Sequence, residues 1–290
     1  MQATHAQLSP VFAEVDDAEQ RISTLLKTQC EGQEPDFVGS TANDDVLHRC
    51  WRVQDQCVFE TVEHALQNKE VFIADGHHRY TTALNYSKEH TDNALAQRCM
   101  FVLVPMQDQG LLVLPTHRVL KNLSGFSLDA LRAALKDVPE LDLSETGSAA
   151  SLEEIALSLP THGAHAMALY DGRSRQSYIL RANTEDPLLR FCPDRPKVWR
   201  TLDVAVLHEL FVDRVVRCHF GGQNVQYNYP HDLQTLKEQC EGENDRIGVI
   251  LQATSLQQVC DVARAGDVMP PKSTFFFPKL ATGLVINALK

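Results

Sequence analysis

The sequence predicts an α+β fold in which helices pack on a mixed β-sheet. Apolar runs of strand length alternate with segments whose apolar residues recur at helical spacing. Some neighbouring runs are joined by helical segments and others by tight turns, as where Asp171 and Gly172 separate two apolar runs in a hairpin pattern. Because both kinds of connection occur, a mixed sheet is favoured over a doubly wound parallel sheet.

The predicted elements follow one another without an internal repeat or a low-complexity tract. The first strand is predicted at residues 8–13, and Asp16 and Asp17 are placed to cap the helix that follows. Alternating or continuous apolar residues predict further strands at residues 46–53, 71–74, 98–105, 111–114, 166–170, 176–180, 225–227 and 246–251. Helical spacing predicts helices at residues 60–69, from 81, from 201, 231–239 and 255–264. A turn at residues 108–110 predicts that the 98–105 and 111–114 strands form a hairpin.

We expect one domain over residues 1–290, with residues 127–159 as a helical insertion. In that segment the composition changes to small, acidic and apolar residues, and leucines recur at helical spacing at Leu128, Leu131 and Leu135. These residues are typical of packing helices rather than of a functional site.

Composition and charge exclude two classes of function. The net charge of −11 over 290 residues argues against non-specific nucleic-acid binding, which requires a basic surface. No stretch is apolar over the length that crosses a bilayer, and the N-terminus lacks a charged segment leading into an apolar one. We therefore expect a cytoplasmic protein with no nucleic-acid or membrane partner. The eight cysteines are scattered without zinc-type spacing, which favours reduced thiols.

The most unusual stretch runs from Val71 to Tyr80. Four apolar residues lead directly into Asp75-Gly76-His77-His78-Arg79-Tyr80, and a segment of helical character follows. This order predicts a strand, a tight turn and the start of a helix. Glycine lets the backbone approach a ligand, and free N–H groups at a helix N-terminus attract anions. The stretch therefore predicts a phosphate-binding turn.

Two further segments carry candidate binding residues. His117 and Arg118 follow the predicted 111–114 strand, so a second histidine-arginine pair lies at a strand end. Lys272, Ser273 and Thr274 lie in a loop that has prolines on both sides. A lysine beside two hydroxyl groups suits an anion, although a solvated loop without a ligand is an equally good interpretation.

These residue types match the needs of phosphoryl transfer, which are cations, N–H donors and a carboxylate that receives the proton of the attacking hydroxyl. Two alternatives remain open. In the first, Asp75 and Arg79 simply pair and stabilise the turn. In the second, Asp75 and one histidine bind a divalent ion, as in a metal-dependent phosphoesterase. His77 and His78 are adjacent, so both rarely bind the same ion.

Residues 73–80, 114–118 and 269–279 resemble, in this order, the signature blocks of the family catalogued as domain of unknown function 1015. The resemblance spans essentially the whole chain. Through its Asp-Gly-His-His-Arg turn the family is related to the ParB and sulfiredoxin-like group, which includes free-serine kinases that use ADP. Members of the 1015 family have been associated with serine phosphorylation by inorganic pyrophosphate.

The resemblance implies a ParB/sulfiredoxin-like core and a phosphotransferase that forms O-phosphoserine from serine, with Mg²⁺ as cofactor. Carried over by position, Asp75, His77 and His78 are the expected catalytic residues, and Asp75 is also the expected metal ligand. The remaining expected site residues bind phosphate or substrate, and they are Gly76, Arg79, Tyr80, His117, Arg118, Lys272, Ser273 and Thr274.

The chain departs from the family pattern at its N-terminal side. Family members carry a substantial region before the strand that begins near Ser9, and we expect this chain to be truncated there. We assign no counterpart to the catalytic glutamate of the wider group of kinases. Three alternatives follow: Asp75 is the base, a partner chain supplies one, or the protein does not catalyse transfer. A nucleotide- or phosphate-binding module without turnover is the competing function.

Overall fold

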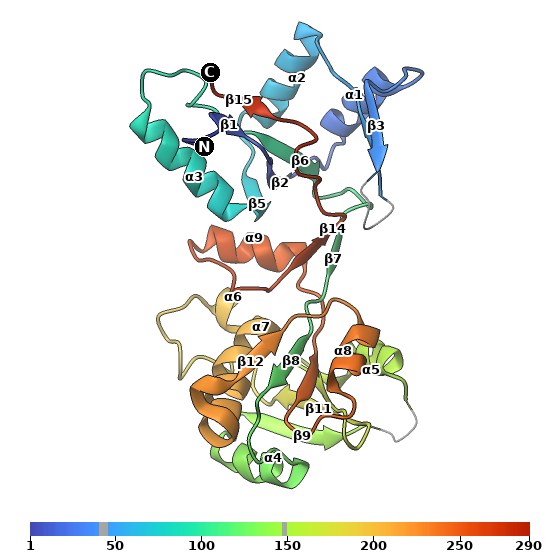
Figure 1. Ribbon diagram of the computed structural model, residues 1–290, viewed down its shortest axis with the longest axis vertical. Coiled ribbons are helices and arrows are strands. Elements are labelled where there is room, and N and C mark those ends of the chain that lie inside the picture. Colours follow the sequence, from blue (N-terminus) through green and yellow to red (C-terminus); the bar gives the residue numbers. More distant parts are fainter. Residues whose placement is uncertain (41–45, 147–149) are drawn as a thin grey trace. The chain divides into compact units, whose positions relative to one another are not determined.

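The computed structural model describes residues 1–40, 46–146 and 150–290, and it has a mixed α+β structure (Figure 1). The chain divides into two compact units, one formed by Met1–Leu112 with Phe276–Lys290 and the other by Val113–Phe275. The divisions fall within β7 (Leu112–Leu114) and β14 (Phe275–Phe277), which form a two-stranded sheet. The predicted α+β class is confirmed, while the expectation of one domain over residues 1–290 stays a prediction.

Unit 1, the N-terminal unit, contains a three-stranded sheet in the order β5 (Val71–Asp75), β2 (Val11–Val15) and β6 (Phe101–Pro105). The central strand β2 runs antiparallel to β5 and parallel to β6, and all five of its residues are buried. Two small sheets pair β1 (Ala6–Gln7) with β15 (Asn287–Ala288) and β3 (Phe37–Ser40) with β4 (Leu47–Cys50). The helices of unit 1 are α1 (Arg21–Cys30), α2 (Gln56–Leu66) and α3 (His77–Glu89).

Local side chains determine where the helices of unit 1 begin. The Asp17 carboxylate accepts hydrogen bonds from the backbone N–H of Ile22 at 3.3 Å and of Ser23 at 3.0 Å, in the first turn of α1. The Asp55 side chain caps α2 by accepting from the N–H of Cys57 at 2.9 Å. These contacts satisfy N–H groups that have no partner within the helix.

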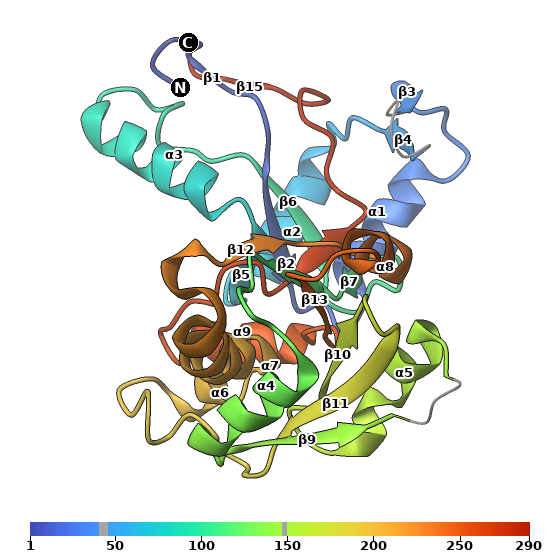
Figure 2. The ribbon, with the colours of Figure 1, turned by 60° about the horizontal axis from the view of Figure 1, so that its bottom comes forward.

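Unit 2, formed by Val113–Phe275, is built on a six-stranded antiparallel sheet (Figure 2). Its strand order is β12 (Gln226–Asn228), β8 (Arg118–Lys121), β13 (Ile247–Ile250), β10 (Met167–Asp171), β11 (Gln176–Ala182) and β9 (Leu141–Glu145). Its helices are α4 (Leu128–Ala134), α5 (Leu152–Ser158), α6 (Lys197–Arg200), α7 (Asp203–Val206), α8 (Leu233–Cys240), α9 (Leu256–Arg264) and the π-helix Leu207–Gly221.

Helices cover both faces of the unit 2 sheet. Consecutive strand residues belong to different apolar clusters, since Leu120 packs in the cluster that includes α4, α7 and the π-helix, while Val119 packs with α5 and α8. Ala168 and Leu169 on β10 are divided between the same two clusters. This alternation is the two-residue period of a strand buried on both faces.

Two predictions about the connections were wrong or incomplete. The expected hairpin of residues 98–105 and 111–114 does not form, because β6 pairs in parallel with β2 and β7 pairs with β14. A turn signal predicts a reversal of the chain, but it does not select the partner strand. Residues 127–159 do contain α4 and α5, but they also contain β9, an edge strand of the six-stranded sheet. The segment is therefore part of the unit 2 sheet; its residues 147–149 lie outside the described residues.

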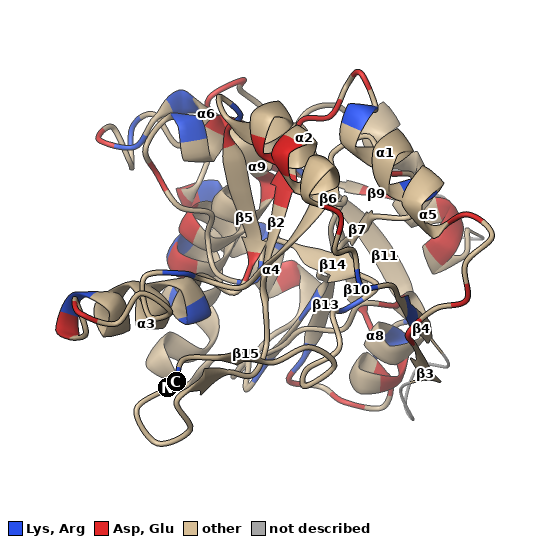
Figure 3. Cartoon of the chain, turned by 90° about the horizontal axis from the view of Figure 1, so that it is seen from above, with Lys and Arg blue, Asp and Glu red and all other residues tan. Residues whose placement is uncertain are grey.

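Charged residues of both signs are distributed over the helices and loops (Figure 3). For example, α2 carries Glu60 and Glu63, whereas α6 carries Lys197 and Arg200. Within the described ranges, no helix is both long enough and apolar enough to cross a membrane.

Candidate active site

The turn after β5 has the predicted strand-turn-helix geometry. β5 ends at Asp75, Gly76 has a left-handed backbone with φ of 96°, and α3 begins at His77. The N–H of Gly76 donates to Asp75 Oδ1 at 2.9 Å, and the first helical hydrogen bond runs from the N–H of Tyr80 to the carbonyl of Gly76 at 2.9 Å. The N–H groups of the first helical turn therefore precede the helical hydrogen-bond ladder, as an anion site requires.

Glycine is needed at position 76 for two reasons. A positive φ of this size is unfavourable for residues with a Cβ atom. A Cβ atom built on Gly76 would also lie 2.9 Å from both Nε and Nη2 of Arg79. Gly76 thus leaves the space in which the Arg79 guanidinium lies against the turn.

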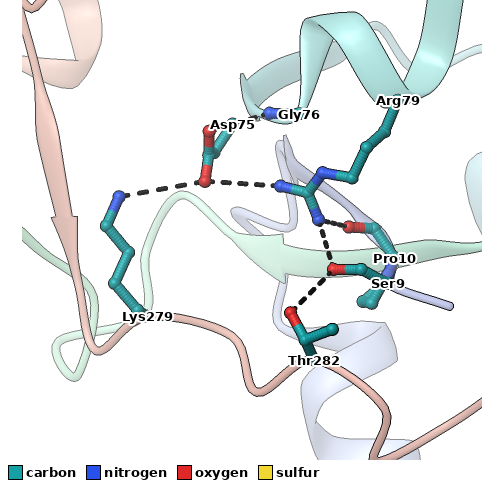
Figure 4. A network of polar contacts seen from close by, with 7 residues as sticks. All are labelled: Ser9, Pro10, Asp75, Gly76, Arg79, Lys279 and Thr282. Carbon is teal, nitrogen blue, oxygen red and sulfur yellow. Dashed lines mark hydrogen bonds and ion pairs between the residues drawn. The ribbon is translucent and has the colours of Figure 1, made fainter.

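The Asp75 carboxylate lies between two cations, as Figure 4 shows. Arg79 Nη2 lies 3.4 Å from Asp75 Oδ2, and Lys279 Nζ lies 3.8 Å from the same oxygen. Arg79 also donates from Nη1 to Ser9 Oγ at 2.8 Å and to the Pro10 carbonyl. We call Asp75, Gly76, Arg79 and Lys279 the Asp75 cluster.

The Asp75 cluster is open to solvent. The side chains of Asp75, Lys279 and Arg79 are 48%, 45% and 34% exposed, and His77 and His78 are exposed as well. A cavity of about 360 Å³ in unit 1 has His78 and Arg79 in its wall, together with Ser9. An anion can therefore reach the cations without unfolding of the turn, although Asp75 already partly neutralises them.

The other predicted binding residues lie in unit 2, where Arg118 is fully buried. Its guanidinium donates to the backbone carbonyls of Thr116, His117 (3.3 Å) and Lys272 (2.8 Å). It also lies over the Tyr229 ring, 4.9 Å from the centroid. Arg118 therefore links the end of β7 to the loop that contains Lys272; this set of contacts is the Arg118 cluster.

Burial changes the protonation chemistry of the Arg118 cluster. Burial lowers the pKa of Arg118 to about 10, against the opposing effect of Tyr229. Burial is also the main cause that lowers the pKa of His117 to about 4, with the Arg118 charge acting in the same direction. Neutral His117 accepts a hydrogen bond at Nδ1 from the N–H of Leu251 at 3.2 Å.

The loop residues of unit 2 differ in their accessibility. Ser273 is buried and its hydroxyl donates to the Pro270 carbonyl at 2.5 Å, whereas Thr274 is half-buried. Lys272 is exposed, has a positive φ of 60°, and its Nζ lies 5.9 Å from the centroid of the Tyr229 ring.

The predicted site residues thus fall into two groups. Asp75, Gly76, His77, His78, Arg79 and Tyr80 belong to unit 1, while His117, Arg118, Lys272, Ser273 and Thr274 belong to unit 2. Tyr80 packs edge-on against Phe101, with ring centroids 6.1 Å apart. The convergence of the two groups on one ligand, and the role of each residue, stay predictions.

Glu14, a buried carboxylate on β2, was not among the predicted site residues. Glu14 is 1% exposed, and neither of its carboxylate oxygens has a hydrogen-bond partner among the described residues. Burial raises its pKa to about 7. Glu14 is paired with Phe72 on β5, beyond a register shift that separates it from the pair of Phe12 and Asp75. An acid inside the apolar run Val11–Val15 is the sequence signal that identifies it.

Contacts around the Asp75 cluster also involve residues that were not predicted as site residues. Ser9 accepts from Arg79, and the hydroxyl of Thr282 lies 3.4 Å from the hydroxyl of Ser9 (Figure 4). Lys279 lies in the block 269–279 that resembles the family, but it was not among the predicted site residues. Ser9 and Lys279 are far from residue 75 in the sequence, so no local pattern indicates their contacts.

The described residues contain no group of three or more histidine, cysteine, aspartate and glutamate side chains that could hold a metal ion. The Asp75 cluster itself contains one carboxylate, that of Asp75. Mg²⁺ is commonly held by one or two carboxylates together with water and substrate phosphates.

Comparisons with known proteins agree with the resemblance seen in the sequence. A family model described as protein of unknown function (DUF1015) matches residues 1–205. No curated protein matches the chain.

Solved structures match over most of the chain but at low similarity. A conserved hypothetical protein from Pyrococcus furiosus is 15% identical with a TM-score of 0.41, covering 94% of this chain and 90% of its own. A mutant free serine kinase in complex with AMP is also 15% identical with a TM-score of 0.41, at 92% and 83% coverage. C-terminally truncated SbnI from Staphylococcus aureus is 10% identical with a TM-score of 0.42, at 99% and 89% coverage. Values this low do not transfer function.

The family match covers well over half of the chain, and it includes the Asp75 turn and the His117-Arg118 pair. The chain belongs to the family described as protein of unknown function DUF1015.

Proposed function

We propose that the protein is a phosphotransferase that moves a phosphoryl group from pyrophosphate or a nucleotide to the hydroxyl of free serine. The observation that supports it best is the Asp75 cluster. Asp75 lies within 4 Å of Arg79 and Lys279, and the turn leads into the N-terminus of α3. The choice of serine rests on the family resemblance, and the chemistry rests on these residues.

Each residue of the cluster suits one part of the reaction. Arg79 can bind phosphate oxygens through two parallel hydrogen bonds, and Lys279 adds a compact positive charge. The N–H groups at the start of α3 and the exposed His77 and His78 add donors. The serine hydroxyl oxygen forms the new bond to phosphorus as the bond to the leaving phosphate breaks, and Asp75 accepts the hydroxyl proton.

Mg²⁺ is the proposed cofactor. Asp75 would hold it together with water and donor phosphate oxygens, since the described residues offer no further carboxylate or histidine cluster. The ion would neutralise charge on the phosphates. Binding of Mg²⁺ requires that Asp75 exchanges part of its contact with Arg79 and Lys279 for the ion.

A second candidate is a phosphate- or nucleotide-binding protein without turnover. It is favoured by one observation: both oxygens of Asp75 are already engaged, Oδ1 by the N–H of Gly76 and Oδ2 by Arg79 and Lys279. A carboxylate held in this way is a weaker candidate for a proton acceptor.

Product analysis of the full chain distinguishes the two functions. The protein is incubated with serine, Mg²⁺ and each of pyrophosphate, ADP and ATP, and O-phosphoserine is measured by mass spectrometry. Asp75→Asn is expected to reduce the rate about a hundredfold or more, as for loss of a general base. Asp92→Asn is the matched control, because Asp92 is exposed on a turn of the same unit.

If no donor yields phosphoserine above the Asp75→Asn background, the phosphotransferase proposal is abandoned. Calorimetric binding of pyrophosphate or nucleotide that is lost in Arg79→Ala would then support the binding protein.

A further inference from the structure

The C-terminal segment of unit 1 passes the Asp75 cluster as an exposed connection between two buried ends. At one end, Phe276 is 2% exposed and its ring packs edge-on against Phe12, with centroids 5.6 Å apart. At the other end, Leu289 is fully buried in a small apolar cluster with α3. Between them, residues 278–286 join β14 to β15, and each of these residues is exposed or half-buried. We call residues 278–286 the strap.

The strap contacts the surroundings of the turn through two side chains, as Figure 4 shows. Lys279 Nζ lies 3.8 Å from Asp75 Oδ2, which is an ion-pair distance but too long for a hydrogen bond. The Thr282 hydroxyl lies 3.4 Å from the hydroxyl of Ser9, which also accepts a hydrogen bond from Arg79. The strap therefore reaches both the carboxylate of the cluster and a residue that positions its guanidinium.

The contacts that hold the strap in this position are weak. Exposed ion pairs contribute little to stability, and the side chains of Lys279 and Asp75 are 45% and 48% exposed. A backbone hydrogen bond from the N–H of Gly283 to the carbonyl of Leu8, at 2.9 Å, joins the strap to the N-terminal segment. Segments with few buried contacts open at a low cost in free energy. The strap can therefore change position while its buried ends stay fixed.

A phosphate group is a stronger partner for Lys279 than Asp75 is. A phosphate carries up to about two negative charges and several acceptor oxygens. The Asp75 carboxylate carries one charge, and its Oδ2 is already shared between Lys279 and Arg79. Because both cations contact this one oxygen, a phosphate bound by Arg79 lies within reach of the flexible lysine side chain.

We propose that the strap closes over the Asp75 cluster when a phosphate group binds there. Lys279 leaves Asp75 and pairs with the phosphate, so the strap covers the ligand and excludes water from it. The same movement removes one of the two cations from Asp75 Oδ2, which leaves this oxygen better able to accept the proton of an attacking hydroxyl. The inference rests on the proposed phosphate site, and it adds an order of events in which the phosphoryl donor binds before Asp75 acts.

Hydrogen exchange followed by mass spectrometry tests the closure on the full chain, with pyrophosphate as the probe and no serine present. Saturating pyrophosphate is expected to slow the exchange of the strap amides about fivefold or more, because closure reduces their opening. Residues 31–34 are the internal control, since they are exposed in the same unit, and their exchange is expected to stay unchanged.

Variants of Lys279 show whether its charge causes the closure. Lys279→Met is expected to bind pyrophosphate about tenfold more weakly, because a charged contact is lost, and to show no protection of the strap even at saturation. Lys279→Arg keeps the charge and is expected to restore both the affinity and the protection. Lys88→Met is the matched control, since Lys88 is an exposed lysine of α3, and it should behave like the unchanged chain.

The outcomes separate the strap from the phosphate site. If pyrophosphate binds but the strap exchanges as fast as before, the closure is refuted and the phosphate site stands. The closure is also refuted if Lys279→Met protects the strap as well as Lys88→Met does. If pyrophosphate does not bind to the full chain, the phosphate site and the closure are both wrong.

Discussion

The Asp75 and Arg118 clusters begin from similar sequences and end in opposite environments. In each, a histidine-arginine pair follows a predicted strand. Arg79 remains one-third exposed and contacts a half-exposed carboxylate, a hydroxyl and one backbone carbonyl, whereas Arg118 is fully buried and donates to three backbone carbonyls. The first arrangement leaves a guanidinium within reach of a ligand. In the Arg118 cluster, the guanidinium instead donates hydrogen bonds that fix the backbone of two separate segments.

The comparison shows that an arginine in a motif is not sufficient evidence of an anion site. A buried arginine whose donors are taken by carbonyls contributes to stability, and an arginine at an open helix N-terminus is available for binding. We therefore expect replacement of Arg118 by methionine to lower mainly stability, and replacement of Arg79 by methionine to lower mainly phosphate binding.

Arg118→Met is expected to give the largest loss of stability. It leaves the carbonyls of Thr116 and Lys272 without their donor inside unit 2, and each buried unpaired group costs about 1–3 kcal/mol. We expect the free energy of unfolding to fall by about 3 kcal/mol or more. The measurement is urea unfolding followed by Trp199 fluorescence in a Trp51→Phe background.

The matched variant is Arg79→Met, for which the expected loss is about 1 kcal/mol because its ion pair is partly exposed. Equal losses for the two variants would contradict the contrast between the clusters.

The two units are expected to respond to pH in opposite directions. His117 has a folded pKa of about 4 against an ordinary 6.5, so between these values the unfolded chain binds a proton that the folded chain does not. Its contribution to the stability of unit 2 is present above pH 6.5 and is lost as the pH falls toward 4. From pH 7 to pH 5 the expected loss is about 2 kcal/mol.

The contribution of Glu14 to stability is expected to change with pH in the direction opposite to that of His117. Its folded pKa is about 7 against an ordinary 4.5, so the folded chain holds a proton that the unfolded chain has lost. The contribution of Glu14 to the stability of unit 1 is therefore largest below pH 4.5 and is lost as the pH rises through 7. Unfolding is followed at several pH values through Trp51 in Trp199→Phe and through Trp199 in Trp51→Phe. Glu14→Gln should abolish the trend of unit 1, and parallel trends in the two units would refute the prediction.

Gly76→Ala is expected to have a smaller effect on stability and a specific effect on the Asp75 cluster. A left-handed backbone costs about 1–2 kcal/mol for a residue with a Cβ, and this Cβ would lie 2.9 Å from the Arg79 guanidinium. Thermal unfolding and pyrophosphate calorimetry measure the two effects. Gly32→Ala is the control, because Gly32 has a φ of 72° in the same unit but nothing within 4 Å of an added Cβ. If both variants bind pyrophosphate equally well, contact between position 76 and Arg79 does not matter for binding.

Much of the Asp75 turn could be predicted because its determinants are local. The apolar residues of β5, the Gly76 turn and the start of α3 are adjacent in sequence, and the structure has all three. Lys279 and Ser9 could not be placed, since their contacts depend on chain segments about 200 and 70 residues away.

Elements whose partners are distant were predicted less well. The strand Arg118–Lys121 was missed because its first residue is a charged one, and burial of an arginine is evident only once carbonyl partners surround it. The partner of β7 depends on β14, about 160 residues later. The helix α9, capped by Ser255, was predicted within one residue of its observed bounds. The helix α2, capped by Asp55, begins four residues before its predicted start at residue 60.

The most direct test of the account is calorimetric binding of pyrophosphate to the full chain and to Arg79→Met, with Arg52→Met as an exposed control in the same unit. If the Asp75 cluster binds phosphate, Arg79→Met lowers the affinity at least tenfold, equivalent to about 1.4 kcal/mol, while Arg52→Met has no effect. Equal affinity of Arg79→Met and Arg52→Met would contradict the assignment of this cluster as the phosphate site.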